Sequence, residues 1–271
     1  MPTRSAVTVS LVPEARGGPF VFWDDLPAAC RRAADLGFDG IEVFPPGADA
    51  VDPAALRKLL ADTGLSLAAV GTGAGWVKHK LTLTSPDPAV RAKAREFVGA
   101  VVEFAAGFGA PAIIGSMQGR WDAQVDRETA LAHLADALAA LGDRAASLGT
   151  FLLYEPLNRY ETNLVNRLED AGPLLARVGG SVKLLADLFH MNIEEAGLAD
   201  ALRAMGSHVG HVHLADSNRR PAGSGHTDFA PVAAALREIG YAGYVSAEAF
   251  PYPSADGAAE RTIAAFRRFF A

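Results

Sequence analysis

Eight short apolar runs recur along the whole chain, and segments with helical periodicity separate them. The runs occupy residues 7–12, 40–44, 65–70, 111–115, 151–155, 182–187, 209–214 and 244–248. They are apolar at nearly every position instead of at alternate ones, as expected for parallel strands that are covered on both faces. The intervening segments, such as 24–35, 88–108 and 128–146, place apolar residues on one helical face. The pattern therefore predicts alternating strands and helices throughout.

Turn chemistry and length favour a closed barrel. A glycine ends the helical pattern before five of the runs, as helix-ending glycines do; they are Gly37, Gly64, Gly109, Gly149 and Gly240. Eight units of roughly 34 residues fill the 271-residue chain, close to the ~250 residues of a typical (β/α)8 TIM barrel. No linker divides the sequence, so we expect a single domain over residues 1–271. A doubly wound sheet with two extra units is the alternative.

Composition limits the compartment and the partners. Cys30 is the only cysteine, so no internal disulfide can form and we expect a cytoplasmic protein in which Cys30 is a packed helix residue. The apolar runs are too short to span a membrane, and the N-terminus does not read as a signal peptide. The net charge is −6 and the arginines are scattered among acids, so we expect no nucleic-acid partner.

Each of the last four runs ends in a potential metal ligand: Glu155, Asp187, His213 and Glu248. At the carboxyl ends of neighbouring barrel strands these side chains would meet, and barrel active sites lie at that end. Alone, each would be read as a helix cap or an ion-pair partner. Together, three carboxylates and an imidazole need a cation, and this donor set suits Mn²⁺, Mg²⁺ or Co²⁺ better than a sulfur-rich zinc site. We expect one divalent ion, with Mn²⁺ as the first choice. His211, two residues before His213, is read as a packed or supporting histidine.

The segments around these ligands carry a resemblance to a known family. They read YEPLNRYET from Tyr154, DLFHMNIEE from Asp187, HVHLADSNR from His211 and SAEAF from Ser246. In these motifs the chain resembles the sugar isomerase/epimerase family with a xylose-isomerase-like TIM barrel. The likeness is to its ketose 3-epimerases, of the D-tagatose, D-psicose and L-ribulose 3-epimerase type. It covers the whole chain and is much less specific for the substrate than for the site.

The resemblance implies a reaction and roles for several residues. The four ligands would bind the cation, and Glu155 and Glu248 would act as acid and base, inverting carbon 3 of a ketose through a cis-enediolate. His190 and Arg219 would donate hydrogen bonds near O2, where negative charge develops. Glu161 would contact a substrate hydroxyl. The loop at residues 221–226 departs from the family's Pro-Gly-x-Gly pattern.

Two further residues bear on the substrate. Trp76 follows the third run, and aromatic residues at such positions in the family enclose the sugar. Arg120 follows the fourth run, where a guanidinium can pair with a carboxylate through two hydrogen bonds. Family members also have Gly-Arg there, so we hypothesise a keto sugar acid as an alternative to a neutral ketose.

Other functions share parts of this pattern. Lyases such as inosose or 3-dehydroshikimate dehydratases, and aldose–ketose isomerases such as hydroxypyruvate isomerase, use the same fold and ligands. An endonuclease IV-like hydrolase would need several zinc ions and more histidines at strand ends. A barrel that binds sugar without turnover would not need both Glu155 and Glu248. By the resemblance, the protein would be a homodimer or homotetramer.

Overall fold

Strand pairing passes once around the molecule and closes on itself. In the computed structural model, which describes residues 3–271, the strands pair in parallel in the order β2-β1-β3-β4-β5-β6-β7-β8-β9, and β1 also pairs with β9. The strands are β1 Arg4–Ser10, β2 Phe22–Trp23, β3 Gly40–Phe44, β4 Ser66–Gly71, β5 Ala112–Ile114, β6 Leu152–Tyr154, β7 Val182–Asp187, β8 Val209–His213 and β9 Tyr244–Ala247. Eight of them, β1 and β3 to β9, form the predicted (β/α)8 barrel, while β2 pairs only with β1. We expect no signal peptide at the N-terminus, and its first two residues, Met1 and Pro2, lie outside the described residues.

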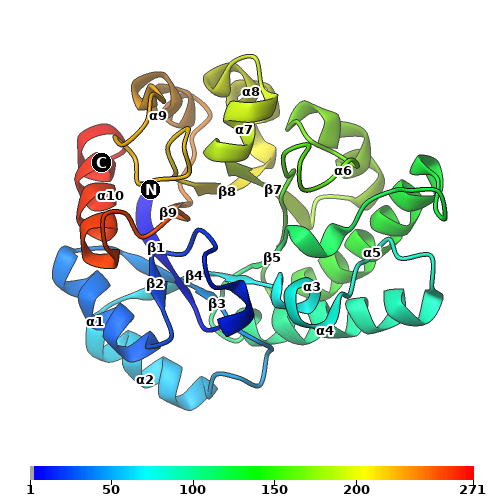
Figure 1. Ribbon diagram of the computed structural model, residues 1–271, viewed down its shortest axis with the longest axis horizontal. Helices are drawn as coiled ribbons and strands as arrows, with labels where there is room; N and C mark the ends of the chain where they lie inside the picture. Colours follow the sequence, from blue (N-terminus) through cyan, green and yellow to red (C-terminus); the bar gives the residue numbers. More distant parts are fainter. Residues whose placement is uncertain (1–2) are drawn as a thin grey trace.

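Helices surround the strands, and the colours of Figure 1 pass once around the ring, so that the first and last strands are neighbours. The helices are α1 Leu26–Leu36, α2 Pro53–Thr63, α3 Ala74–His79, α4 Pro88–Ala106, α5 Arg127–Ser147, α6 Gly172–Val178, α7 Leu188–Glu194, α8 Leu198–Met205, α9 Phe229–Glu238 and α10 Ala255–Phe269. Asp25 caps α1 by accepting a hydrogen bond from the Ala28 N–H. The five predicted helix-ending glycines all have positive φ, between 68° and 80°, a conformation that glycine adopts without strain.

The first strand differs from its prediction because the barrel must close. The apolar pattern predicts a strand over 7–12, but β1 begins at Arg4, whose N–H donates to the Gly243 carbonyl, and its first four residues pair with β9. The polar residues Arg4 and Ser5 carry no apolar signal for this pairing. At the other end, Pro13 starts a short 3-10 turn, so the strand stops early.

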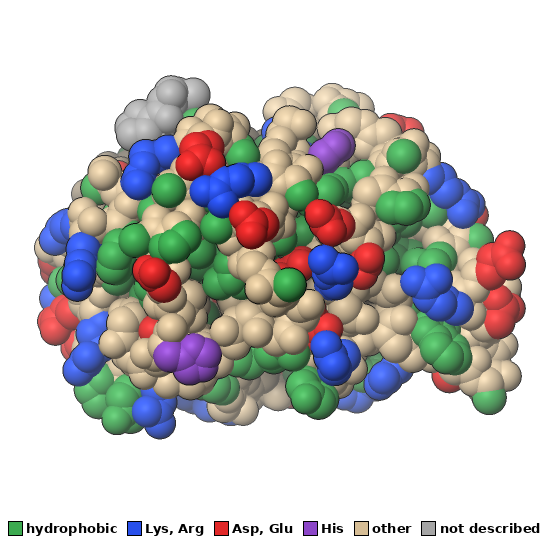
Figure 2. Space-filling view, turned by 90° about the horizontal axis from the view of Figure 1, so that it is seen from above, with side chains coloured by type: hydrophobic (Ala, Val, Ile, Leu, Met, Phe, Trp, Pro, Cys, Tyr) green, Lys and Arg blue, Asp and Glu red, His purple; other side chains and the backbone are tan. Residues whose placement is uncertain are grey.

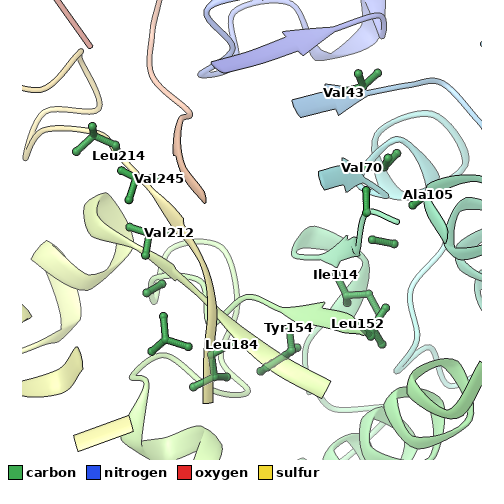
Figure 3. Close-up of a cluster of buried hydrophobic side chains, with 14 of the residues drawn as sticks. Val43, Val70, Ala105, Ile114, Leu152, Tyr154, Leu184, Val212, Leu214 and Val245 are labelled. Atoms are coloured by element: carbon green, nitrogen blue, oxygen red, sulfur yellow. The ribbon is translucent and has the colours of Figure 1, made fainter. Parts of the chain in front are cut away.

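Alternate residues of each strand face opposite layers of the core. Outward side chains such as Val43, Leu184 and Val245 belong to a large cluster beneath the helices, part of which is drawn in Figure 3. Inward side chains fill the barrel in a separate cluster of Ala69, Ile113, Leu153 and Leu185. Both faces of the strands are buried, which explains why the runs read as continuously apolar.

The outer surface mixes both signs of charge. On the face shown in Figure 2, basic and acidic side chains are interspersed instead of gathering in one stripe. Across residues 3–271, the helices are each too short or too polar to cross a bilayer.

Cys30 provides a test of the core. It is fully buried on α1, and burial raises the pKa of its thiol to about 12. The reactive species is the thiolate, which is scarce at pH 8 in this environment. We expect a thiol-specific disulfide reagent to label the native protein at least about a hundredfold more slowly than the chain unfolded in guanidinium. Equal labelling rates in the two states would contradict this placement of α1.

Candidate active site

The inward alternation of the last four strands carries side chains from the core to the mouth of the barrel. Residues two apart on a strand point to the same face. The inner positions therefore lead from Leu153 to Glu155, from Leu185 to Asp187, from His211 to His213, and from Ser246 to Glu248. Glu155 and Glu248 come directly after β6 and β9, while Asp187 and His213 are the last residues of β7 and β8. The same pattern that packs the barrel thus gathers four polar groups at one rim.

The four side chains predicted as ligands do lie together. One donor atom from each can be chosen so that all lie within 4.8 Å of one another. His213 Nδ1 is 3.2 Å from Asp187 Oδ2, 3.3 Å from Glu248 Oε2 and 3.5 Å from Glu155 Oε1. A cation with oxygen ligands at about 2.1 Å holds adjacent ligand atoms roughly 3 Å apart. The spacing therefore suits a single small divalent ion.

Glu155 shows that this cluster needs a positive charge. Its Oε1 is buried and has no hydrogen-bond partner among the described residues. Burial, and then the neighbouring Glu248 carboxylate, raise the pKa of Glu155, although His213 opposes the shift. An orphaned carboxylate oxygen that faces two other carboxylates is costly unless a cation coordinates it. The donor set present thus fits a divalent metal ion.

Gly115 leaves the space that Glu155 occupies. A Cβ added at Gly115, just beyond β5, would lie 2.5 Å from Glu155 Oε2. That separation is shorter than any ordinary carbon–oxygen contact, so a side chain here would displace the carboxylate. The absence of a side chain at this position is part of the site.

Glu42 on β3 contacts two histidines of the candidate site, and the sequence interpretation missed it. Its Oε1 lies 3.0 Å from His213 Nε2 and its Oε2 lies 2.9 Å from His211 Nε2. Burial alone would raise the pKa of Glu42, but the two histidines outweigh it and hold the pKa well below its usual range. One signal in the sequence could have identified Glu42, because it is the only charged residue within the apolar run at 40–44.

This contact orients the imidazole of His213. With Nε2 bound to Glu42, Nδ1 is the nitrogen left to face the three carboxylates. Burial lowers the pKa of His213, but Glu42 and Glu248 outweigh it and raise the pKa well above its usual value. The proton held on Nδ1 is the one that a metal ion would replace on binding.

Arg219 supplies positive charge beside the cluster. Its Nη1 donates to both carboxylate oxygens of Asp187, at 2.8 and 2.7 Å, and its Nη2 donates to Glu248 Oε2. Burial would raise the pKa of Asp187, but the arginine and the nearby histidines lower it instead. Asp187 also caps α7 by accepting the N–H groups of Phe189 and His190. It therefore stays ionised and fixed in place.

The loop that carries Arg219 is organised around a buried carboxylate. Arg219 has a φ of 61°, and Asp216 accepts backbone N–H groups from Ser217, Gly223 and Thr227 at 2.8 to 3.0 Å. These hydrogen bonds define the 221–226 segment that departs from the family's glycine pattern. The loop holds the guanidinium in position despite that departure.

His190 points one defined nitrogen into the site. Its Nδ1 accepts the Asn158 backbone N–H at 3.3 Å and lies 2.7 Å from the Asn158 side-chain amide. An accepting nitrogen of a neutral imidazole carries no proton, so the proton is on Nε2. Nε2 lies 3.9 Å from Glu155 Oε1, next to the cluster. His190 can therefore donate a hydrogen bond to a molecule bound there.

The predicted substrate contacts divide between two cavities. Glu161, His190 and Arg219 line a cavity of about 540 Å³ that also includes three of the four ligand-cluster residues. Trp76 and Arg120 do not line it; they line a neighbouring cavity of about 460 Å³. The aromatic walls of the first cavity come from Phe20, Phe44, Phe189 and Phe250. The interpretation from sequence missed these phenylalanines, which lie in loops, at the end of β3 and at the start of α7, without a distinctive spacing.

Comparisons with known proteins identify a family and several relatives. The family described as xylose isomerase-like TIM barrel matches residues 30–269. The chain is 34% identical over 244 residues to a D-psicose 3-epimerase of Agrobacterium fabrum, covering 87% of this chain and 80% of the relative. It is 32% identical over 265 residues to an L-ribulose 3-epimerase of Methylomonas sp., with 94% and 91% covered. A crystal structure of a D-psicose 3-epimerase in the presence of D-fructose matches with a TM-score of 0.81, at 27% identity and 99% coverage of both chains.

Replacing Glu42 tests its role in holding His213. We expect Glu42→Gln to weaken Mn²⁺ binding about 10- to 100-fold, the usual effect of losing a group that orients a metal-binding histidine. Isothermal calorimetry on the metal-free protein would measure the change. Glu96→Gln, at an exposed position of α4, is the matched control and should leave affinity unchanged. Equal affinities in the two variants would contradict the role of Glu42.

Gly115→Ala tests the space behind Glu155. The added methyl group should push the carboxylate out of the cluster and weaken Mn²⁺ binding about tenfold or more. Gly99→Ala in α4 is the control, because the nearest atom to its new methyl group is 3.9 Å away. That substitution should leave metal affinity unaltered and slightly raise the thermal unfolding temperature. Tight binding in Gly115→Ala would mean that Glu155 is not a ligand.

Proposed function

The chain belongs to the xylose isomerase-like TIM barrel family, and from this premise we propose that it is a metal-dependent carbohydrate epimerase that inverts carbon 3 of a ketose. Three relatives that match 87% or more of the chain are named D-psicose or L-ribulose 3-epimerase, and such epimerases belong to the isomerase class of enzymes. The observation that carries the proposal is the joining of two glutamates, from non-adjacent strands β6 and β9, in one cluster that fits a cation.

Inversion beside a carbonyl needs a group that removes a proton from one face and a group that returns one to the other. We assign these roles to Glu155 and Glu248, whose strands are separated by β7 and β8. Each can turn one carboxylate oxygen toward the cluster and keep the other for proton transfer. The roles exchange with the direction of the reaction, so neither is fixed as the base.

Glu155, Asp187, His213 and Glu248 would hold the metal ion, for which Mn²⁺ is our first choice. When bound, the ion would act as a Lewis acid that stabilises negative charge on the two substrate oxygens of a cis-enediolate. The Nε2–H of His190 and the guanidinium of Arg219 are donors that can share this charge. Glu161 is assigned to a substrate hydroxyl.

The geometry favours a neutral ketose over a keto sugar acid. Arg120, the residue expected to pair with the carboxylate of an acid, lies in the second cavity, where the carboxylates of Asp122 and Glu161 also lie. With one cation and two acids, that cavity would repel an anion more than it attracts one. The cytoplasmic location and the homodimer or homotetramer remain predictions.

The reaction can be followed by isotope exchange at carbon 3. In D₂O with Mn²⁺, we expect solvent deuterium at carbon 3 of a recovered ketose from a panel of free ketoses, and no dehydrated product. Glu155→Gln and Glu248→Gln should each lower kcat about 10²- to 10⁴-fold, the usual contribution of an acid or base. Glu96→Gln is the control and should retain activity. Accumulation of a dehydrated product would instead assign the protein to the lyases.

A further inference from the structure

The second cavity adjoins the first at the mouth of the barrel. Ser116, Leu157 and Glu161 line both cavities, so these three residues form the boundary between them. Glu161 also links the boundary to the reaction site, because its Oε1 lies 3.8 Å from His190 Nδ1 and accepts the side-chain N–H of Asn158. A molecule bound at the ligand cluster would therefore have to extend past Glu161 to reach the second cavity.

The walls of the second cavity come from loops that hold one another in place. Thr84 Oγ1 donates to the Gln118 carbonyl at 3.0 Å, and Thr162 Oγ1 donates to the Gly119 carbonyl at 2.8 Å. These bonds tie the segments that follow β4, β5 and β6 into one unit. The cavity is thus preformed, and a ligand would not need to order its walls.

Its lining suits an uncharged, hydroxyl-bearing ring. Two large aromatic side chains border it although they are 40% (Trp76) and 78% (Tyr160) exposed. The Arg120 side chain has no hydrogen-bond or ion-pair partner within residues 3–271. The backbone carbonyl of Arg120 accepts a hydrogen bond from Thr84 Oγ1. Thr82 and Asp122 add further polar groups. Aromatic faces pack against the C–H face of a pyranose, while these polar groups can bind its hydroxyls.

The volumes of the two cavities and their positions also suit a substrate that carries a second ring. The first cavity, at about 540 Å³, is by itself within the range of roughly 300–1,000 Å³ for small-molecule sites. The second, at about 460 Å³, is also within it. A ketose held at O2 and O3 leaves both ends of its carbon chain free to carry a substituent.

We propose that the second cavity is a subsite for a glycosyl group carried by the reacting sugar, so that the enzyme takes glycosylated ketoses in preference to free ones. The inference rests on the proposed epimerase function and adds the substrate class. Tyr160, Trp76 and Arg120 are the residues that would recognise the glycosyl ring.

Binding and turnover of matched sugars test the subsite. The probes are D-fructose and its 1-O- and 6-O-α-D-glucosyl derivatives, which place a pyranose on either end of the same ketose. Calorimetry on the Mn²⁺-loaded protein would measure affinity, and deuterium exchange at carbon 3 would measure turnover. We expect at least one glucosylated ketose to bind about tenfold or more tightly than D-fructose, because the glucosyl ring can pack against two aromatic side chains.

Variants then locate the effect. Tyr160→Ala and Trp76→Ala should each lower the ratio of affinities, glucosylated over free, by about fivefold or more. Tyr252→Ala is the matched control, because the Tyr252 ring is 44% exposed and lines neither cavity, and it should leave the ratio unchanged.

The outcomes distinguish a failure of the subsite proposal from a failure of the proposed epimerase function. Equal affinity for free and glucosylated ketoses, or a preference retained in both cavity variants, would overturn the subsite while leaving the epimerase proposal intact. Absence of exchange with every ketose would overturn the proposed function, and the calorimetric ratios would still decide whether the second cavity binds a glycosyl group.

Discussion

The rest of this structure depends on one constraint, which is that several carboxylates are buried together at one end of the barrel. Glu42, Glu155 and Asp187 are buried and Glu248 is nearly so, all at one end of the barrel. Carboxylates this close repel one another, and desolvation adds to the cost unless positive groups compensate. Among the described residues, Arg219 and the imidazole of His213 supply part of that compensation. The orphaned oxygen of Glu155 marks the part that remains for a metal ion.

Much of the fold and of the metal cluster could be predicted from the sequence, because strand periodicity links core and rim. A run that is apolar at nearly every position predicts a parallel strand buried on both faces. The polar residue that ends the run lies two positions after an inward core residue, so it also faces the barrel axis. Glu155 after Leu153 and Asp187 after Leu185 follow this rule. The start of β1 could not be predicted in this way, because Arg4 is held by the pairing that closes the barrel and not by its own burial.

The substrate contacts were harder to predict because loops set their positions. Trp76 was expected to enclose the sugar and Arg120 to pair with a substrate carboxylate, and both line the adjoining cavity. Arg120 follows Gln118 in a loop that Thr84 holds by a hydrogen bond to the Gln118 carbonyl, a contact that no periodic pattern encodes. Glu42 was missed for another reason. Its charge breaks an apolar run, and its partners His211 and His213 follow 169 and 171 residues later in the sequence.

The bond between Glu42 and His213 joins the two halves of the molecule. All four proposed metal ligands lie on the second half-barrel, from β6 onward, whereas the carboxylate that steadies their imidazole comes from β3 in the first. A fragment containing only β6 to β9 would possess all four proposed ligands and would lack the contact between Glu42 and His213. Tight metal binding would therefore require the closed ring of strands in addition to the four ligands.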